Sequence, residues 1–336
     1  MLYPIKFTPV YKSRIWGGTK LNEIYSRVIP STDIGEAWEV CCRDDGMSVV
    51  SNGDLQGMPF DRLIDTYGSA IYGHIRMPGG RFPLMLKLLD VNSDLSVQVH
   101  PTEEYILNNS IPNDEEKNEM WYVLSAEDNA SVICGLRQGT TRESLQEAIN
   151  EDKIESVLER MPVKTGDVIM IPAGSVHAAG TGMLLFELQQ SSDTTYRLYD
   201  YKRKDASGKE RRLDIDKALG TINYGSSAYK VEQKEFVDRT NFSWRRVFQC
   251  DLFCLDELEI RDGVYRCRNN KDFVIYTCIK GVACIQGNSV SVELAEGESC
   301  FIPACLTNYG ITGECRVLAS SVRPHVKMFE KDRGTV

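Results

Sequence analysis

The sequence predicts a mainly β protein in which a jelly-roll module occurs twice, with a few short helical insertions. Three observations support this fold class. Short runs rich in Val, Ile, Tyr and Phe are separated by Gly, Pro, Asn and Asp, which is the pattern of strands and turns. Helical patterns are too few and too irregularly placed for repeated βαβ units, and one strand motif occurs twice. The length of 336 residues fits about two domains.

The clearest strand signals are apolar runs bounded by turn-forming residues. Their β-branched and aromatic side chains favour a half-buried pleated surface. We expect strands at residues 119–124, 130–134, 167–171, 184–189, 273–279 and 282–285.

Three segments predict helices. Residues 59–67 form the first helix, which Gly68 stops. Thr140 and Glu143 have the spacing of a capping box and predict a helix that continues to about residue 160. Residues 213–219 predict a short third helix.

An eight-residue motif divides the chain into two similar modules. Residues 166–173 contain a Gly and an acidic residue followed by an apolar strand that ends in Ile-Pro-Ala, and this pattern recurs 131 residues later at 297–304. Proline ends strand pairing because it has no backbone N–H. Each copy follows earlier apolar strand runs and precedes a further strand, as in a jelly roll used twice.

Composition limits the classes of ligand and location. The 39 basic and 48 acidic residues give a net charge of −9 without a basic run, so we expect a small molecule and neither nucleic acid nor membrane as partner. The N-terminus lacks the layout of a signal peptide, which predicts a cytoplasmic protein. The eleven cysteines lack Cys-x-x-Cys spacing, and many lie in apolar runs, so we expect small buried hydrophobic residues.

Three segments carry residues with metal-ligating side chains. Strict alternation from residue 95 to 101 places Ser96, Gln98 and His100 on one face of a strand. Glu119 opens another strand, and His177 follows the strand end of the first module. Two imidazoles, one carboxylate and one amide form a mixed nitrogen and oxygen set, which suits a catalytic Zn²⁺ with room for water or substrate.

The second module cannot assemble the same ligand set. The position 131 residues after His177 is Asn308, and there is no histidine between Ile275 and Asn308. We therefore expect a catalytic, metal-binding domain at residues 1–220 and a second, metal-free domain at 230–325. The boundary is expected in the polar stretch at residues 202–235.

Four ordered motifs of the chain resemble those of type I mannose-6-phosphate isomerases in their short bacterial form. They are Ser96-Val97-Gln98-Val99-His100-Pro101, Lys117-Asn118-Glu119-Met120-Trp121-Tyr122, residues 171–178 and residues 192–200. The segments Trp16-Gly17-Gly18 and 35–39 are similar to the opening motifs of the same family. The resemblance covers residues 5–205 strongly and the remainder weakly, and an ordered motif series is far more specific than any single pattern.

The resemblance implies a double cupin fold and a zinc-dependent interconversion of mannose 6-phosphate and fructose 6-phosphate, with one Zn²⁺ in each chain. It places the metal ligands at Gln98, His100, Glu119 and His177, and a catalytic arginine at Arg197. It places the substrate-binding positions at Trp16, Glu36, Lys87, Ser96, Lys117 and Asp193. Ala179 departs from the tyrosine that some longer members carry, and their long helical insertion is reduced here to residues 140–160, which leaves open how the sugar is covered.

The reaction transfers a proton between C1 and C2 of an open-chain sugar through an enediolate. A bound zinc ion would polarise the carbonyl, and the guanidinium of Arg197 would hold the developing negative oxygen. Candidates for the proton carrier are Glu36, Lys117, Asp193 or a metal-bound hydroxide. Two alternatives remain open: an iron-dependent cupin oxygenase, and a non-catalytic protein that binds sugar phosphates.

Overall fold

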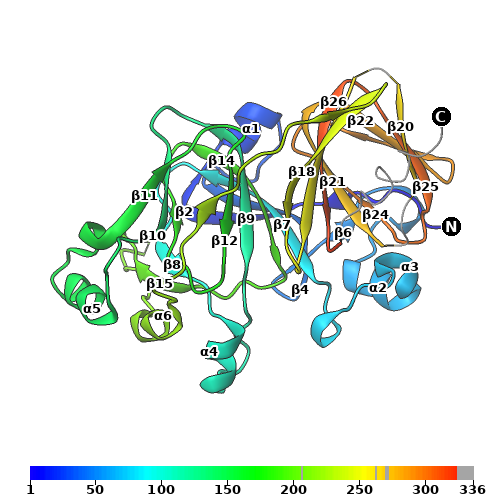
Figure 1. Ribbon diagram of the computed structural model, residues 1–336. Helices are drawn as coiled ribbons and strands as arrows, with labels where there is room; N and C mark the ends of the chain where they lie inside the picture. The colour runs from blue at the N-terminus through cyan, green and yellow to red at the C-terminus, as the bar shows by residue number, and fades with distance from the viewer. Residues whose placement is uncertain (206, 262, 269–271, 324–336) are drawn as a thin grey trace.

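The computed structural model describes residues 1–205, 207–261, 263–268 and 272–323. Two β-barrels lie side by side, each built from one large and one smaller sheet (Figure 1). This architecture confirms the prediction of a mainly β, double cupin fold. The predicted end of the second domain at residue 325 lies outside the described residues.

The first barrel has a seven-stranded antiparallel sheet in the order β16-β12-β9-β14-β7-β3-β2. Its strands are β2 (Val10–Gly18), β3 (Ile34–Val40), β7 (Leu84–Val91), β9 (Glu119–Ala126), β12 (Val168–Ile171), β14 (Met183–Gln190) and β16 (Tyr229–Lys230). The facing side has a three-stranded sheet, β11-β10-β13, and the pair β15-β8. These are β8 (Val97–Val99), β10 (Ser131–Leu136), β11 (Leu158–Pro162), β13 (Ala178–Ala179) and β15 (Tyr196–Tyr199).

The second barrel repeats this plan with a six-stranded sheet, β17-β18-β19-β26-β21-β24, and a four-stranded sheet, β20-β25-β22-β23. The large sheet contains β17 (Val237–Asp238), β18 (Phe242–Gln249), β19 (Cys254–Ile260), β21 (Val274–Gly281), β24 (Ser299–Ile302) and β26 (Cys315–Ser321). The smaller sheet contains β20 (Val264–Arg268), β22 (Ala283–Gly287), β23 (Val290–Leu294) and β25 (Asn308–Thr312).

The remaining elements are short. The strands β1 (Phe7–Thr8) and β6 (Val49–Val50) form one small pair, and β4 (Cys42–Arg43) and β5 (Gly46–Met47) form another. The helices are α1 (Lys20–Tyr25), α2 (Phe60–Tyr67), α3 (Ser69–Tyr72), α4 (Glu103–Asn108), α5 (Arg142–Asn150) and α6 (Ile215–Thr221), with 3₁₀ turns η1 (Gly53–Leu55), η2 (Pro78–Gly80) and η3 (Ile154–Val157). None of the helices in the described part of the chain has the length and apolar character to cross a membrane.

Two of the three predicted helices agree with the structure and the third is corrected. Helix α2 ends at Gly68 as expected, and α6 overlaps the expected segment but begins and ends two residues later than predicted. Helix α5, predicted to reach residue 160, ends at Asn150 because Asp152 adopts a positive φ of 60°. The chain then turns and forms β11, which pairs with β10, so sheet pairing replaces the last helical turns.

The N-terminus of α5 is also corrected. Thr141, and not Thr140, is the N-cap residue, and its side chain accepts a hydrogen bond from the Ser144 N–H. Ser144 Oγ in turn accepts from the Thr141 N–H, so Ser144 completes the capping box in place of Glu143. A hydroxyl can serve in that position because it also accepts a hydrogen bond.

The sequence repeat corresponds to one strand position in both barrels. Strand β12 pairs with β9, and strand β24 pairs with β21. The register sets Ile171 opposite Glu119 in the first barrel and Ile302 opposite Val274 in the second. Val274 therefore occupies the position that Glu119 has in the first barrel, and a valine cannot ligate a metal.

Apolar residues form separate layers on the two faces of the seven-stranded sheet. One cluster fills the first barrel and includes Val123, Leu185 and Val132. A larger cluster lies on the outer face and joins the sheet to the second barrel, where Phe186 shares a core with Leu255. A third cluster fills the second barrel. The site described next lies within the first barrel, and the second barrel covers the sheet that carries it.

Candidate metal centre

Three buried ligand side chains meet inside the first barrel. His100 follows β8, Glu119 begins β9, and His177 lies in the loop between β12 and β13. His100 Nε2 lies 3.2 Å from Glu119 Oε2, and His177 Nε2 lies 3.2 Å from Glu119 Oε1. One potential ligand atom from each residue falls within 4.8 Å of the others. Segments that are far apart in sequence thus converge on one carboxylate.

Both imidazoles are oriented by backbone carbonyls. His100 Nδ1 lies 3.0 Å from the Thr194 carbonyl oxygen, and His177 Nδ1 lies 2.9 Å from the Ser175 carbonyl oxygen. A carbonyl only accepts hydrogen bonds, so each Nδ1 carries the proton and each Nε2 is left as a lone-pair donor. This is the tautomer that metal ligation through Nε2 requires.

The charges around the site keep these groups in their ligating forms. Burial, together with the positive charge of Lys117, lowers the pKa of His100 from 6.5 to about 3. Burial alone would raise the pKa of Glu119, but Lys117 and the two imidazoles hold it well below 4.5. At neutral pH the site therefore has a neutral His100 and an ionised Glu119.

The buried polar atoms of the site fit a bound cation. His100 Nε2 and both Glu119 carboxylate oxygens are buried and take part in no well-aligned hydrogen bond, although Lys117 Nζ is 2.7 Å from Glu119 Oε2. Leaving such atoms without a partner costs free energy, which a metal ion would recover. Two imidazoles and a carboxylate suit Zn²⁺ and other first-row divalent metals.

Gln98 lies at the edge of the same group. Its Nε2 is 3.3 Å from His177 Nε2, and its backbone pairs with His177 in both directions. Turning the amide by 180° would present Oε1 at this position, as a ligand must. Strand β8 therefore places Gln98 next to the three converging residues.

A second cluster surrounds Lys87, which β7 places across the sheet from Glu187. Lys87 Nζ lies 3.6 Å from Glu36, 3.5 Å from Glu187 and 3.4 Å from Asp193. Burial would lower the pKa of Lys87, but these carboxylates raise it above 10.5. Lys87 is therefore a fixed positive charge, and it cannot accept a proton at neutral pH.

Glu36 is fully engaged in this second cluster. Arg14 Nε donates to its Oε1 at 2.8 Å, and Trp38 Nε1 donates to its Oε2 at 2.5 Å. Burial would raise the pKa of Glu36, but Lys87 and Arg14 lower it to about 2. Such a carboxylate is a weak base at neutral pH, and both of its oxygens already accept hydrogen bonds.

Glu187 is a site residue that the sequence analysis did not single out. Its Oε2 accepts a hydrogen bond from Trp121 Nε1 at 2.8 Å, its Oε1 is buried without a hydrogen-bond partner, and Lys87 pairs with it. Burial and the nearby charge of Glu119 raise its pKa above 4.5. The sequence shows only that Glu187 is a charged residue within an apolar strand segment, which by itself does not indicate a site residue.

The indole of Trp121 connects the two clusters. Its ring lies edge-on to the His177 imidazole, with centroids 5.7 Å apart, while its N–H binds Glu187. Glu187 pairs with Trp121 across β14 and β9. The three potential metal ligands and the cluster around Lys87 are therefore neighbours inside the first barrel.

The other predicted residues lie apart from these two clusters. Arg197 on β15 pairs with Gln98 through the backbone, and its Nε donates to Ser96 Oγ at 3.1 Å. Arg197 and Ser96 thus form a third group beside the metal ligands. Trp16 is packed into the apolar core of the barrel at 5% exposure, against the backbone of Gly35, where an added Cβ would be 2.7 Å from the indole.

Family models match both parts of the chain. Residues 5–138 match the model described as phosphomannose isomerase type I, catalytic domain, and residues 245–322 match mannose-6-phosphate isomerase, cupin domain.

The chain is also similar to individual proteins over nearly its whole length. It is 35% identical to mannose-6-phosphate isomerase ManA of Bacillus subtilis, over 94% of this chain and 98% of that protein. It is 30% identical to mannose-6-phosphate isomerase of Streptococcus mutans, over 95% of this chain and 98% of that protein. The crystal structure of mannose 6-phosphate isomerase from Bacillus subtilis superposes with a TM-score of 0.86 at 31% identity, covering 95% of this chain and 99% of that chain.

Proposed function

Since this chain belongs to the type I mannose-6-phosphate isomerase family, we propose that it interconverts mannose 6-phosphate and fructose 6-phosphate with one zinc ion held by Gln98, His100, Glu119 and His177. The observation that carries the metal site is the convergence of the buried His100, Glu119 and His177 side chains. Within this group, His100 Nε2 and both Glu119 oxygens have no hydrogen-bond partner. Two imidazoles and one carboxylate favour zinc over magnesium or calcium, which prefer sites made only of oxygen.

The chemistry moves a proton between C1 and C2 of the open-chain sugar. When bound, zinc would supply a Lewis acid for the carbonyl oxygen or the adjacent hydroxyl. Arg197, always charged, would hold the negative oxygen that develops in the enediolate. Lys87, held protonated by three carboxylates, would add a second fixed positive charge.

We assign the proton transfer to Glu187. A carboxyl that accepts and returns a proton works best when its pKa is near the working pH, and the pKa of Glu187 is raised while that of Glu36 is lowered. Glu187 also has an oxygen free of hydrogen bonds in a buried position. Ser96, Lys117, Asp193, Trp16 and Glu36 are proposed to bind or enclose the substrate.

A cytoplasmic location goes with this proposal. The structure contains no disulfide bond in the described part of the chain, and most cysteines are buried. Buried thiols of this kind suit a reducing compartment.

The test is a coupled assay of mannose 6-phosphate conversion to fructose 6-phosphate on the purified protein. Activity and metal content are measured on one sample before chelation, after chelation, and after addition of Zn²⁺ or Fe²⁺. Loss of turnover on chelation and recovery with Zn²⁺ would support both parts of the proposal.

Other results separate the alternatives. Turnover that persists after complete metal removal would contradict the metal assignment. Oxygen consumption that depends on Fe²⁺, without isomerisation, would favour an oxygenase. Tight binding of the sugar phosphate by zinc-loaded protein without turnover would favour a non-catalytic binding protein.

A further inference from the structure

The orientation of His100 depends on a loop that lies outside its own strand. The Thr194 carbonyl, which accepts the hydrogen bond from His100 Nδ1, belongs to residues 191–195, between β14 and β15. In contrast, the carbonyl that orients His177 is only two residues away, at Ser175. His100 is therefore held correctly only as long as this loop keeps its conformation.

The carbonyls of two successive loop residues are bound by side chains from two different strands. Gln189 Nε2, from β14, donates to the Ser192 carbonyl at 2.5 Å. Arg43 Nη1, from β4, donates to the Ser191 carbonyl at 2.9 Å. Gln189 is part of the barrel interior, whereas Arg43 lies on the short β4–β5 pair outside the seven-stranded sheet.

Arg43 also binds the segment that meets the loop on its other side. The same Nη1 donates to Glu115 Oε2 at 2.7 Å, and Arg81 pairs with the other Glu115 oxygen. Around Thr194, the Glu115 N–H donates to Thr194 Oγ1 at 3.1 Å, and Ser192 Oγ donates to the Glu115 carbonyl at 3.1 Å. The Arg43 guanidinium thus binds both the 191–195 loop and Glu115, and Glu115 in turn binds Ser192 and Thr194 of that loop.

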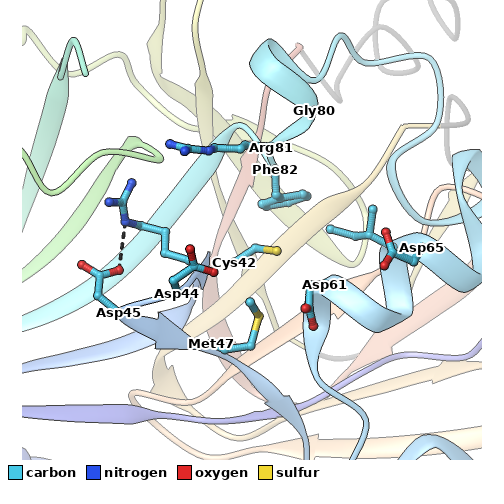
Figure 2. Close-up of a pocket in the computed structure, with 11 residues that line it drawn as sticks. Cys42, Asp44, Asp45, Met47, Asp61, Asp65, Gly80, Arg81 and Phe82 are labelled. Atoms are coloured by element: carbon cyan, nitrogen blue, oxygen red, sulfur yellow. Dashed lines mark hydrogen bonds and ion pairs between the residues drawn. The ribbon is translucent and has the colours of Figure 1, made fainter. Parts of the chain in front are cut away.

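Arg43 reaches the loop from a pocket of about 410 Å³ that is distinct from the metal group. Figure 2 shows this pocket with Asp45, Arg81 and Phe82 around it, and Asp45 pairs with Arg43 Nε at 3.1 Å. None of the four proposed metal ligands lines the pocket. The contacts that connect Arg43 with the metal site therefore run through the 191–195 loop and Glu115.

We propose that Arg43 is a positioning residue for the metal centre: by binding the Ser191 carbonyl and Glu115 together, it holds the Thr194 carbonyl against His100 Nδ1. Partners that fix a metal-ligating imidazole typically change metal affinity by 10- to 100-fold. Arg43 does not contact the imidazole itself but acts through the loop that does. We therefore expect a change in metal affinity of about tenfold, at the lower end of this range. The inference rests on the proposed metal site.

The test measures cobalt binding by the full-length protein, because Co²⁺ replaces Zn²⁺ in such sites and its visible absorption bands report ligand geometry. The variants are Arg43→Met and Glu115→Gln. The matched control is Arg261→Met, since Arg261 also pairs with one aspartate and one glutamate, Asp238 and Glu259, but in the second barrel. Affinity is measured by competition with a chromophoric chelator, and the thermal midpoint of the metal-free protein reports folding.

We expect Arg43→Met to weaken Co²⁺ binding about tenfold and to shift the absorption bands, and Glu115→Gln to act in the same direction. Arg261→Met should change neither readout. Wild-type affinity and an unchanged spectrum in Arg43→Met would overturn the inference. A wild-type protein that binds no Co²⁺ would instead refute the proposed metal site, so the two failures are distinguishable.

If Arg43→Met does not fold, a second variant tests whether the 191–195 loop controls metal binding. Thr194→Val keeps the volume of the side chain and the carbonyl that faces His100, but removes the acceptor of the Glu115 N–H. Weaker Co²⁺ binding in folded Thr194→Val supports the role of the loop. Unchanged binding and spectrum would refute it.

Discussion

The histidines of the metal group differ in how much of the molecule is needed to orient them. His177 uses a carbonyl in its own loop, whereas His100 uses one that the chain reaches only after 94 further residues. Both Nε2 atoms nevertheless approach the same carboxylate at 3.2 Å. Substitutions of single residues in and around this group can distinguish metal binding from catalysis.

We predict that His177→Ala abolishes bound metal and isomerase activity together while the barrel remains folded. The imidazole supplies a ligand atom, but the apolar cluster around it comes from many other residues. Metal analysis, the coupled assay and a thermal melt on one preparation check this. His74→Ala, at an exposed position, should retain all three properties, and a metal-loaded His177→Ala protein would contradict the ligand assignment.

Glu187→Gln should lower kcat by about 10²- to 10⁴-fold and leave metal content unchanged. Glu187 must be ionised to accept a proton, so kcat of the wild type should rise with pH through its pKa. Because burial of the carboxyl raises that pKa, we expect kcat to increase with pH in a range above pH 4.5. The pH profile of kcat should lose this limb in the variant, and a wild-type kcat would exclude Glu187 as proton carrier.

Arg197→Lys should lower kcat at least about tenfold with little change in metal content or KM. A lysine ammonium keeps the charge but cannot reproduce the planar fork that donates to Ser96 and to the Arg212 carbonyl. Steady-state kinetics with mannose 6-phosphate check this, with Arg212→Lys as an exposed control. Unchanged turnover would remove Arg197 from the mechanism.

The residues that could be predicted are those whose chemistry shows in their type and order. The chain has only four histidines, and His100 and His177 each lie next to a strand, so their positions indicated candidate metal ligands. Glu187 and Arg43 belong to common types, and only the folded structure shows that one carboxylate is buried beside Trp121 and that one guanidinium joins two loops.

At the scale of elements, strands were easier to predict than the end of a helix. Strand β12 and its repeat β24 follow from an apolar run between Gly and Pro. The end of α5 depends on competition between helix and sheet, because β11 finds a partner in β10. Local helix propensity gives no information about pairing with a strand elsewhere in the chain. The predicted helix was therefore about ten residues too long.

The capping geometry of α5 provides a test at this scale. Thr141→Ala should reduce the free energy of unfolding by about 1 kcal/mol, because it removes the acceptor for the Ser144 N–H. Thr140→Ala should cost less, since the Thr140 hydroxyl only donates to the Arg137 carbonyl. Urea unfolding of both variants compares them, and equal losses would contradict the assignment of Thr141 as the N-cap residue.

The two barrels share one apolar core, and an aromatic cluster forms part of it. Phe301 of β24 stacks on Phe273 at 5.4 Å and meets Phe60 and Phe82 at 5.4 and 5.9 Å. Its backbone also pairs with Ile5 near the N-terminus. Residues from the first hundred and the last hundred positions of the chain therefore share one core.

Phe301→Ala should lower the free energy of unfolding by about 3–5 kcal/mol, because it leaves a cavity in this shared core. Since the cluster belongs to both barrels, we expect one cooperative transition shifted as a whole, with metal release at the same temperature. Calorimetry of the metal-loaded protein checks this. Two separated transitions, with only the second barrel affected, would show that the barrels unfold independently.

The back-to-back sheets also have a consequence for assembly. Many proteins cover the apolar outer face of a sheet by forming a dimer, and their folded fraction then falls on dilution. Here the covering surface is a degenerate copy of the same barrel on the same chain, with Val274 in place of Glu119. Because the two barrels are parts of one chain, the second barrel continues to cover this face at any dilution.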